Sequence, residues 1–194
     1  MKFKIAMAIG LASSLLVSVA NATVITFTDR ASFETALTSF STDDYTDITA
    51  GLLTSIDRGD YTIASPSMYG CVNNPTSCGL TPPAGDGIGL FHYLGADTFT
   101  FDTAINGFGF DFGQTVNTFT TKPIIDGVTS PELQGFFGII YDEAKTTFVL
   151  NQNRQNLITD NLTYGVTAVP EPSTLAIFSL GLICLASRRF KKQS

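Results

Sequence analysis

Tryptophan is missing from this 194-residue chain, and histidine occurs once, at His92. A lone histidine gives weak support to imidazole-based catalysis and leaves no set of ligands for a zinc site. His92 shares its alternation with Ile88, Leu90 and Leu94, so we expect a buried or half-buried strand residue. Without tryptophan, the sixteen phenylalanines must supply the large core side chains.

Motifs that carry enzyme chemistry are also missing. No G-x-S-x-G element occurs, and no Lys-Ser or Lys-Thr follows Gly85–Gly89, which excludes a phosphate loop there. Carboxylate pairs of the glycosidase kind are expected by chance in such an acidic chain. The sequence therefore predicts a non-enzymatic protein, with a secreted hydrolase as an alternative.

Cations are scarce between the two ends of the chain. Residues 23–168 contain five Lys or Arg against sixteen Asp or Glu, a net charge of −11, whereas the whole chain carries −6. Such a charge repels nucleic acid and anionic membranes, so neither is expected as a partner of this part of the protein. It favours solubility and could attract Ca²⁺.

Only two cysteines, Cys71 and Cys78, lie in residues 23–168, and the third is Cys184. An even pair in an exported protein predicts a disulfide that closes a short loop. A metal pair is disfavoured because His92 is the only other soft ligand nearby.

The first 22 residues have the features of a secretory signal peptide. Lys2 and Lys4 precede an apolar stretch, and Ala20-Asn21-Ala22 is an A-x-A site at which signal peptidase would cut before Thr23. The alternative is an uncleaved N-terminal anchor.

The last 26 residues, 169–194, have three parts in a fixed order. A polar spacer comes first, then an apolar run over Thr174–Ala186 that predicts a short transmembrane helix, then a basic stop that favours the cytoplasmic side. The spacer consists of Val169, Pro170, Glu171 and Pro172, and the basic stop of Arg188, Arg189, Lys191 and Lys192.

This tail resembles the PEP-CTERM sorting signal of Gram-negative bacteria. The resemblance implies a transient anchor in the inner membrane and cleavage near Pro170–Pro172 by the membrane protease-transpeptidase exosortase. It further implies release or attachment at the cell surface, in a host that makes extracellular polysaccharide. The alternative is an ordinary single-span anchor.

Residues 23–168 are expected to form one mostly β domain, an antiparallel β-sandwich with one short helix near its N-terminus. Strands are predicted at Val24–Thr28, at Tyr61–Ala64 and in several short stretches from residue 88 to residue 165. Asp29 predicts the start of a helix over Arg30–Ser39. Residues 41–60 are expected to be loop with one weak strand, and 65–87 a long loop closed by the cysteines.

The clearest strand pattern lies at residues 104–112. Phe108, Phe110 and Phe112 are expected on one face, opposite glycines that suggest a closely approached surface. Further on, strands Gly135–Tyr141 and Thr146–Leu150 are expected to be joined by a turn at residues 142–144. These segments resemble the jelly-roll-like ectodomains often found in front of PEP-CTERM tails.

Asp160 is the polar residue that most needs an explanation, because Ile158, Leu162 and Tyr164 share its alternation. One interpretation is a Ca²⁺ site, and the other is a carboxylate that accepts backbone N–H groups. The candidate ligands are Asp160, Asn161, Asp142 and Glu143, and no D-x-D-x-D-G loop accompanies them.

Taken together, the sequence predicts an exported cell-surface or extracellular-matrix protein that is processed by exosortase and associated with exopolysaccharide. Exposed aromatic side chains would make the polysaccharide contacts, with Tyr45, Tyr69 and Tyr93 as candidates. A Ca²⁺-dependent carbohydrate-binding module is the first alternative.

Overall fold

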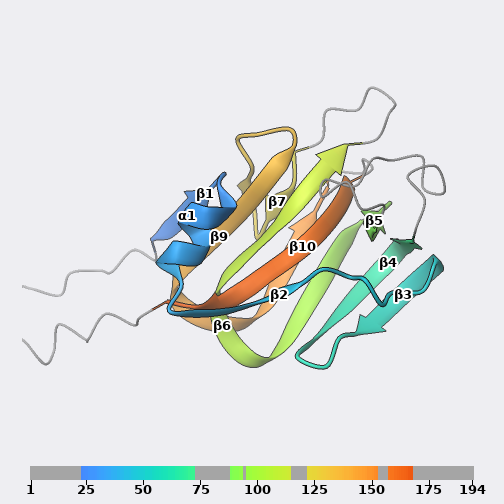
Figure 1. Cartoon of the computed structure of the whole chain (residues 1–194), viewed down its shortest axis with the longest axis horizontal. Coiled ribbons are helices and arrows are strands. Elements are labelled where there is room, and N and C mark those ends of the chain that lie inside the picture. The colour runs from blue at the N-terminus through green and yellow to red at the C-terminus, as the bar shows by residue number, and fades with distance from the viewer. Residues whose placement is uncertain (1–22, 73–87, 94, 115–121, 153–156, 168–194) are drawn as a thin grey trace, which may run out of the picture.

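A computed structural model describes residues 23–72, 88–93, 95–114, 122–152 and 157–167. The strands in these ranges form a single antiparallel sheet, and one short helix, α1 (Arg30–Ala36), accompanies it (Figure 1). The strands are β1 (Val24–Phe27), β2 (Ser39–Asp43), β3 (Gly51–Asp57), β4 (Tyr61–Cys71), β5 (Gly89–His92), β6 (Ala96–Gln114), β7 (Ile124–Ile125), β8 (Val128–Thr129), β9 (Gly135–Asn151) and β10 (Leu157–Val166).

Two long strands, β6 and β9, run through the whole domain and bend as they go (Figure 1). The first half of β6 pairs with β4, and the second half pairs with β10. Register shifts between Thr100 and Gly107 mark the bend of β6. Because β5 pairs with both β4 and β10, the sheet curls back on itself and encloses a core.

Phenylalanine fills that core, as the sequence predicts. Phe108, Phe110 and Phe112 are at most 1% exposed, and the Phe108 ring stacks on Phe148 with centroids 4.8 Å apart. Burial of three such side chains contributes about 5–9 kcal/mol to folding. The alternation in the sequence therefore identified the inner face of β6 correctly.

The opposite face of β6 and β9 is covered by α1. Phe33 and Leu37 pack there with Phe136 and Ile140 in a second, smaller apolar cluster. A Cβ atom on Gly109 would lie 2.8 Å from the Cα of Gly138 on the paired strand, which is too close for any side chain. The expectation of a closely approached glycine face is confirmed.

The helix begins where the sequence predicts. Asp29 caps it by accepting a 2.7 Å hydrogen bond from the backbone N–H of Ser32. Hydrogen bonds from the Ser32 side chain and from this N–H lower the pKa of Asp29. The helix ends at Ala36 instead of Ser39, because the chain turns extended at Leu37 and enters β2 at Ser39.

The prediction for residues 41–71 was wrong in two respects. Residues 41–60, expected to be loop with one weak strand, contain the end of β2 and all of β3. The strand expected at Tyr61–Ala64 continues to Cys71, so residues 65–71 are strand and not loop, Pro66 included. Among the described strands, β2 and β3 each pair with one neighbour only, and such edge strands need no apolar alternation. In β4, which pairs on both sides, Ser65, Pro66 and Ser67 interrupt the apolar pattern.

The turn predicted at residues 142–144 is not present, because β9 is continuous from Gly135 to Asn151. Its polar middle runs beside the bend of β6, where Lys145 is in register with Ile105. The residues in the middle of β9 are polar because this bend of the strand is exposed to solvent. The final strand, expected at Leu157–Gly165, is confirmed as β10.

The mostly antiparallel β fold and its short N-terminal helix are confirmed, whereas the jelly-roll-like sandwich stays a prediction. No helix among the described residues is long and apolar enough to cross a membrane. The signal peptide, the tail helix and the strand expected at residues 115–120 lie outside the described ranges.

Replacing Gly109 tests the close approach of β6 and β9. Gly109→Ala places a methyl group against the backbone of Gly138, so we expect a loss of about 1–3 kcal/mol in the free energy of unfolding. Urea denaturation measures this change. The control is Ser55→Ala on the exposed face of β3, and equal midpoints for the two variants would contradict the packing described.

The predicted disulfide can also be tested. Cys71 is buried at the end of β4, while Cys78 lies outside the described residues, so the pairing stays a prediction. Closing so short a loop is expected to contribute about 2–3 kcal/mol. Mass spectrometry after alkylation without reduction should find both thiols protected, and alkylated Cys71 and Cys78 in the exported protein would refute the bond.

Candidate functional site

A row of exposed apolar and aromatic side chains crosses the outer face of β3, β4 and β5. The strand register places Leu52 opposite Tyr69, and Tyr69 opposite Phe91. The ring of Tyr93 follows, 5.9 Å from that of Phe91. Leu52 is 69% exposed, Tyr69 37% and Tyr93 47%. These four residues are called the aromatic row below.

Packing contacts and a backbone hydrogen bond attach the row to the sheet beneath it. Phe91 packs against Cys71 and Ile158, which are both buried, and Tyr93 donates its backbone N–H to the carbonyl of Ser67 at 3.1 Å. Exposed aromatic side chains on a rigid sheet present flat apolar surface together with hydroxyl groups. This combination suits a ligand that has both apolar faces and many hydroxyls.

Of the three tyrosines predicted to contact polysaccharide, Tyr69 and Tyr93 are exposed and Tyr45 is not. Tyr45 is fully buried, so the expectation for this residue was wrong. It lies in the left-handed backbone region at φ 56°, with its N–H bonded to the carboxylate of Asp43 at 3.0 Å. The Arg58 guanidinium lies 5.8 Å from its ring, so the local polar network holds Tyr45 inside.

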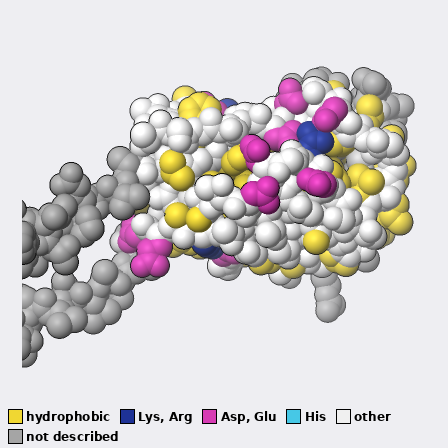
Figure 2. Space-filling view, turned by 90° about the horizontal axis from the view of Figure 1, so that it is seen from below, with side chains coloured by type: hydrophobic (Ala, Val, Ile, Leu, Met, Phe, Trp, Pro, Cys, Tyr) yellow, Lys and Arg dark blue, Asp and Glu magenta, His cyan; other side chains and the backbone are white. Residues whose placement is uncertain are grey.

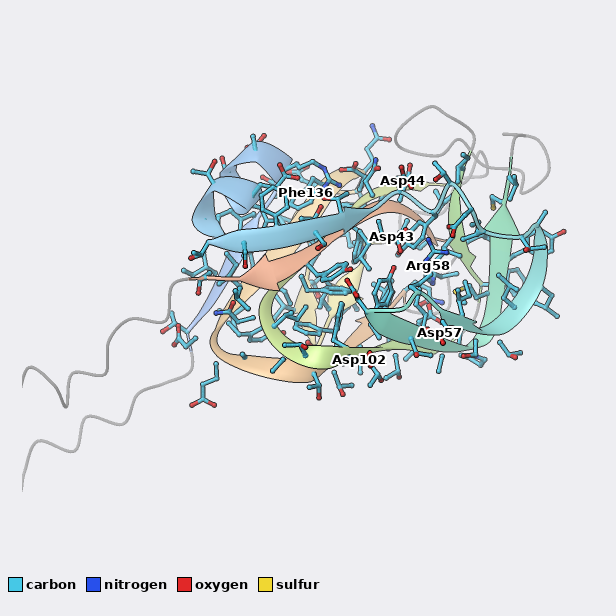
Figure 3. All side chains as sticks on the ribbon, turned by 60° about the horizontal axis from the view of Figure 1, so that its bottom comes forward. Asp43, Asp44, Asp57, Arg58, Asp102 and Phe136 are labelled. Atoms are coloured by element: carbon cyan, nitrogen blue, oxygen red, sulfur yellow. The ribbon has the colours of Figure 1, made fainter. Side chains whose placement is uncertain are left out.

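That polar network centres on Asp43. Arg58 makes two hydrogen bonds of 2.8 Å to this carboxylate, and the Tyr61 hydroxyl donates a third at 2.7 Å. Figure 3 shows Asp43 and Arg58 facing each other at this end of the sheet. Burial alone would raise the pKa of Asp43, but these hydrogen bonds outweigh it and hold the pKa below its usual range.

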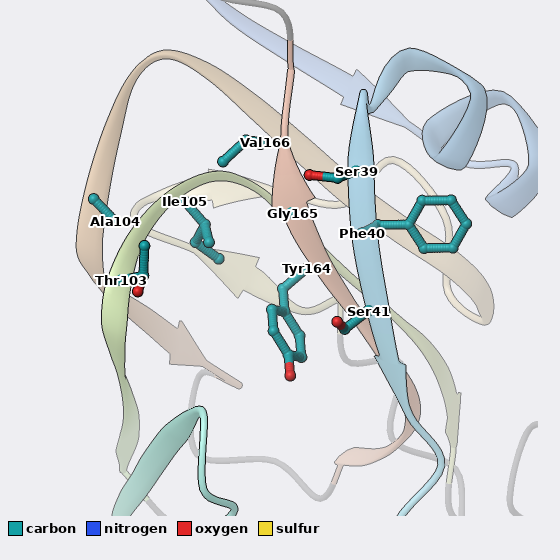
Figure 4. A pocket seen from close by; sticks show the side chains of 9 residues that line it. All are labelled: Ser39, Phe40, Ser41, Thr103, Ala104, Ile105, Tyr164, Gly165 and Val166. Carbon is teal, nitrogen blue, oxygen red and sulfur yellow. The ribbon is translucent and has the colours of Figure 1, made fainter.

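A groove lies beside Tyr164, between β2 and the bend of β6 (Figure 4). It consists of two adjoining hollows of about 270 and 210 Å³, which share Thr103, Ile105 and Tyr164. The Tyr164 hydroxyl donates to Asp60 at 2.9 Å, and burial together with this carboxylate raises the pKa of Tyr164 to about 12. The tyrosine therefore stays neutral across physiological pH.

The surface around this groove is acidic. Figure 2 shows Asp and Glu side chains gathered around a basic group on this face. Asp60 and Asp102 line the groove, and the other exposed carboxylates come from β3 and from the loop before it, namely Asp44, Asp47 and Asp57. An anionic polymer would be repelled here.

Asp160 is fully buried, and its Oδ1 atom accepts the N–H of Asn161 at 2.7 Å. The β-bulge of β10 begins at this point, and Asn161 takes a positive φ of 47°. The side-chain amide of Asn161 donates a hydrogen bond of 3.0 Å to the carboxylate of Asp111. The same carboxylate forms a salt bridge of 2.9 Å with Arg30. The N–H that Asp160 accepts belongs to the next residue of β10 and not to a neighbouring loop, so its interpretation as a carboxylate that accepts backbone N–H groups of such a loop stays a prediction.

The four residues considered as Ca²⁺ ligands are not brought together. Asp160 lies opposite Asp111, which is in register with Phe136 on β9, whereas Asp142 lies six residues further along that strand. Asp142 instead accepts the N–H of Thr23 at 2.5 Å, and Glu143 is exposed. Within the described ranges, no three His, Cys, Asp or Glu side chains form a group that could hold a metal ion.

His92 sits in a buried line of polar groups. Its Nδ1 lies 2.5 Å from Asp97 Oδ2, and its Nε2 lies 2.8 Å from the hydroxyl of Thr159. An acid, an imidazole and a hydroxyl in sequence resemble a hydrolase triad in connectivity. All three are at most 1% exposed, so no substrate can reach the hydroxyl, and the expectation that His92 is a buried strand residue is confirmed.

Sequence reasoning missed both the register of the aromatic row and the groove at Tyr164. Neither has a local signal, because each joins side chains that lie far apart in the chain. Leu52 and Phe91 can be placed beside Tyr69 only when the pairing of β3, β4 and β5 is known.

Comparison with known proteins identifies the C-terminal segment. Residues 168–192 match the PEP-CTERM protein-sorting motif, so the chain carries this motif as the sequence predicts. The motif implies an exported protein that exosortase processes. No curated protein and no solved structure matches the chain significantly.

The Asp43 network predicts a defined acid sensitivity. Because the pKa of Asp43 is lowered on folding, its stabilisation is present above the unfolded value of about 4 and is lost as the pH falls below it. We expect Asp43→Asn to lower the free energy of unfolding by about 1.5–3 kcal/mol near neutral pH. The acid limb, which is the fall of this free energy as the pH drops below about 4, should become flatter. Urea melts from about pH 7 to pH 3 measure both effects.

The matched control for this prediction is Asp44→Asn, which removes a neighbouring carboxylate outside the Arg58 contacts. It should keep the acid limb of the parent protein. An Asp43→Asn variant with the parent's acid limb would show that the network does not stabilise the fold.

The separation of the proposed Ca²⁺ ligands predicts that EDTA and Ca²⁺ leave the melting temperature of residues 23–168 unchanged. A bound ion would raise it in proportion to its occupancy. A melting temperature that falls in EDTA and recovers with Ca²⁺ would restore the calcium-dependent alternative.

Proposed function

We propose that residues 23–168 are a non-enzymatic domain of the cell surface or extracellular matrix that associates with polysaccharide through the aromatic row. The PEP-CTERM motif supports export and processing. The observation that supports the ligand class is the in-register set of the exposed Leu52 and Tyr69 and the partly exposed Phe91, with the exposed Tyr93 beside it. Signal peptidase and exosortase would act on the precursor, which the inner membrane holds transiently.

Polysaccharide fits this surface for physical reasons. Pyranose rings have flat C–H faces that pack on aromatic rings, and their hydroxyls can bond to those of Tyr69 and Tyr93. A row that crosses neighbouring strands, spaced about 4.8 Å apart, follows an extended chain over more than one sugar unit. The domain's net charge of −11 favours a neutral or cationic polymer over an anionic one.

A role without catalysis agrees with the site geometry. The Asp97–His92–Thr159 line is enclosed, so its groups serve the interior of the fold. The His92 ring bonds to Asp97 on one side and to Thr159 on the other, and so links β5 to β10 inside the fold.

Truncating the row tests the proposal. Tyr69→Ala and Tyr93→Ala should each weaken retention on the host's own polysaccharide about two- to tenfold, since one aromatic contact is worth roughly 0.5–1.5 kcal/mol. Affinity electrophoresis in gels containing that polysaccharide measures the change. Phe40→Ala is the matched control, because Phe40 is 48% exposed on β2, outside the row.

Equal retention of the parent and both tyrosine variants would contradict the assignment of the row. Absence of retention for the parent protein, on every polysaccharide fraction of the host, would overturn the proposed function itself.

A further inference from the structure

The two ends of the described domain meet at one place on β9. Val24 is in register with Tyr141, and the N–H of Thr23 bonds to the Asp142 carboxylate at 2.5 Å. From the other end, Asn106 links Tyr141 to Thr167. Figure 1 shows the chain leaving the domain on the same side at both ends. We call Thr23, Asn106, Tyr141, Asp142 and Thr167 the terminal pole.

Asn106 binds Thr167, the last described residue, through both the nitrogen and the oxygen of its side-chain amide. Its Nδ2 donates to the Thr167 hydroxyl at 2.7 Å and to the Tyr141 carbonyl at 3.1 Å. Its Oδ1 accepts the backbone N–H of Thr167 at 2.8 Å. Asn106 is only 4% exposed, so these bonds are shielded from water. Thr167 is therefore part of the folded body, one residue beyond the end of β10.

The sorting motif begins at residue 168, immediately after this fastened residue. Two residues, Ala168 and Val169, separate Thr167 from Pro170, and the three Cα–Cα steps between them span at most about 10–11 Å when extended. A protease that works at the membrane surface must take Pro170–Pro172 into its cleft. The folded domain, held so close, restricts the approach of that cleft.

We propose that Asn106 is a positioning residue for exosortase processing, because its hold on Thr167 sets how far the Pro-Glu-Pro segment can reach from the folded body. Opening the two Asn106–Thr167 bonds frees Thr167 and lengthens the accessible chain. The processing rate then depends on how often this contact opens. The inference rests on the sorting motif and is independent of any polysaccharide ligand.

The test is pulse-chase labelling of the full-length protein in cells that carry an exosortase, followed by mass spectrometry of the new C-terminus. Asn106→Ala removes both bonds to Thr167 and should speed conversion of precursor to mature protein at least two- to tenfold, the range that corresponds to the net contribution of a single hydrogen bond. Thr167→Val removes only the hydroxyl partner and keeps the backbone N–H, so its effect should be smaller.

A second variant separates reach from stability. A Gly-Ser-Gly-Ser insertion between Thr167 and Ala168 leaves every described contact in place and lengthens the chain, so it should also speed processing. Gly109→Ala destabilises the fold away from the terminal pole and should leave the rate unchanged. Slower or unchanged processing of the insertion variant would overturn the proposal, as would equal acceleration by Asn106→Ala and Gly109→Ala.

Discussion

The pairing of β6 with β9 is the constraint on which the rest of the domain depends. Phenylalanines on one face of this pair fill the enclosed core, and the glycines on the other face let α1 lie against the sheet. Gly109 and Gly138 approach too closely for side chains, so the pair can be buried on both faces only with glycine there. Because both strands are long and bent, one pair of strands holds together the β4 side and the β10 side of the sheet.

This arrangement separates the two surfaces for which different roles are proposed. The terminal pole lies where β10 ends at Val166, and the aromatic row lies where β10 begins, with Ile158 beside Phe91. Eight steps along β10 separate Ile158 from Val166, at most about 26 Å because the bulge at Asn161 shortens the strand. In a precursor anchored by the tail, which follows the terminal pole, the proposed binding surface would lie at the far end of β10. Processing and binding can then proceed without competing for the same face.

Features that depend on the pattern of residues close together in the chain could be predicted from the sequence. The inward Phe108, Phe110 and Phe112, the Asp29 cap and the last strand are examples, because each depends on residues a few positions apart. Features that depend on distant pairing could not. The bend of β9 was mistaken for a turn because its polar residues face solvent, and Tyr45 was expected to be exposed although Asp43 and Arg58 hold it inside. Of the three tyrosines predicted to contact polysaccharide, Tyr69 and Tyr93 are exposed, whereas their neighbours in the row could be found only from the strand register.

The most direct test of this account is a nuclear magnetic resonance titration of residues 23–168 with neutral oligosaccharides prepared from the host's extracellular polysaccharide. The account predicts the largest chemical-shift changes at Tyr69, Phe91 and Tyr93, with the amides of Asn106 and Thr167 unmoved. Largest changes at the Tyr164 groove or at the terminal pole would contradict the assignment of the two surfaces, and a spectrum unchanged by every oligosaccharide would contradict the polysaccharide-binding role.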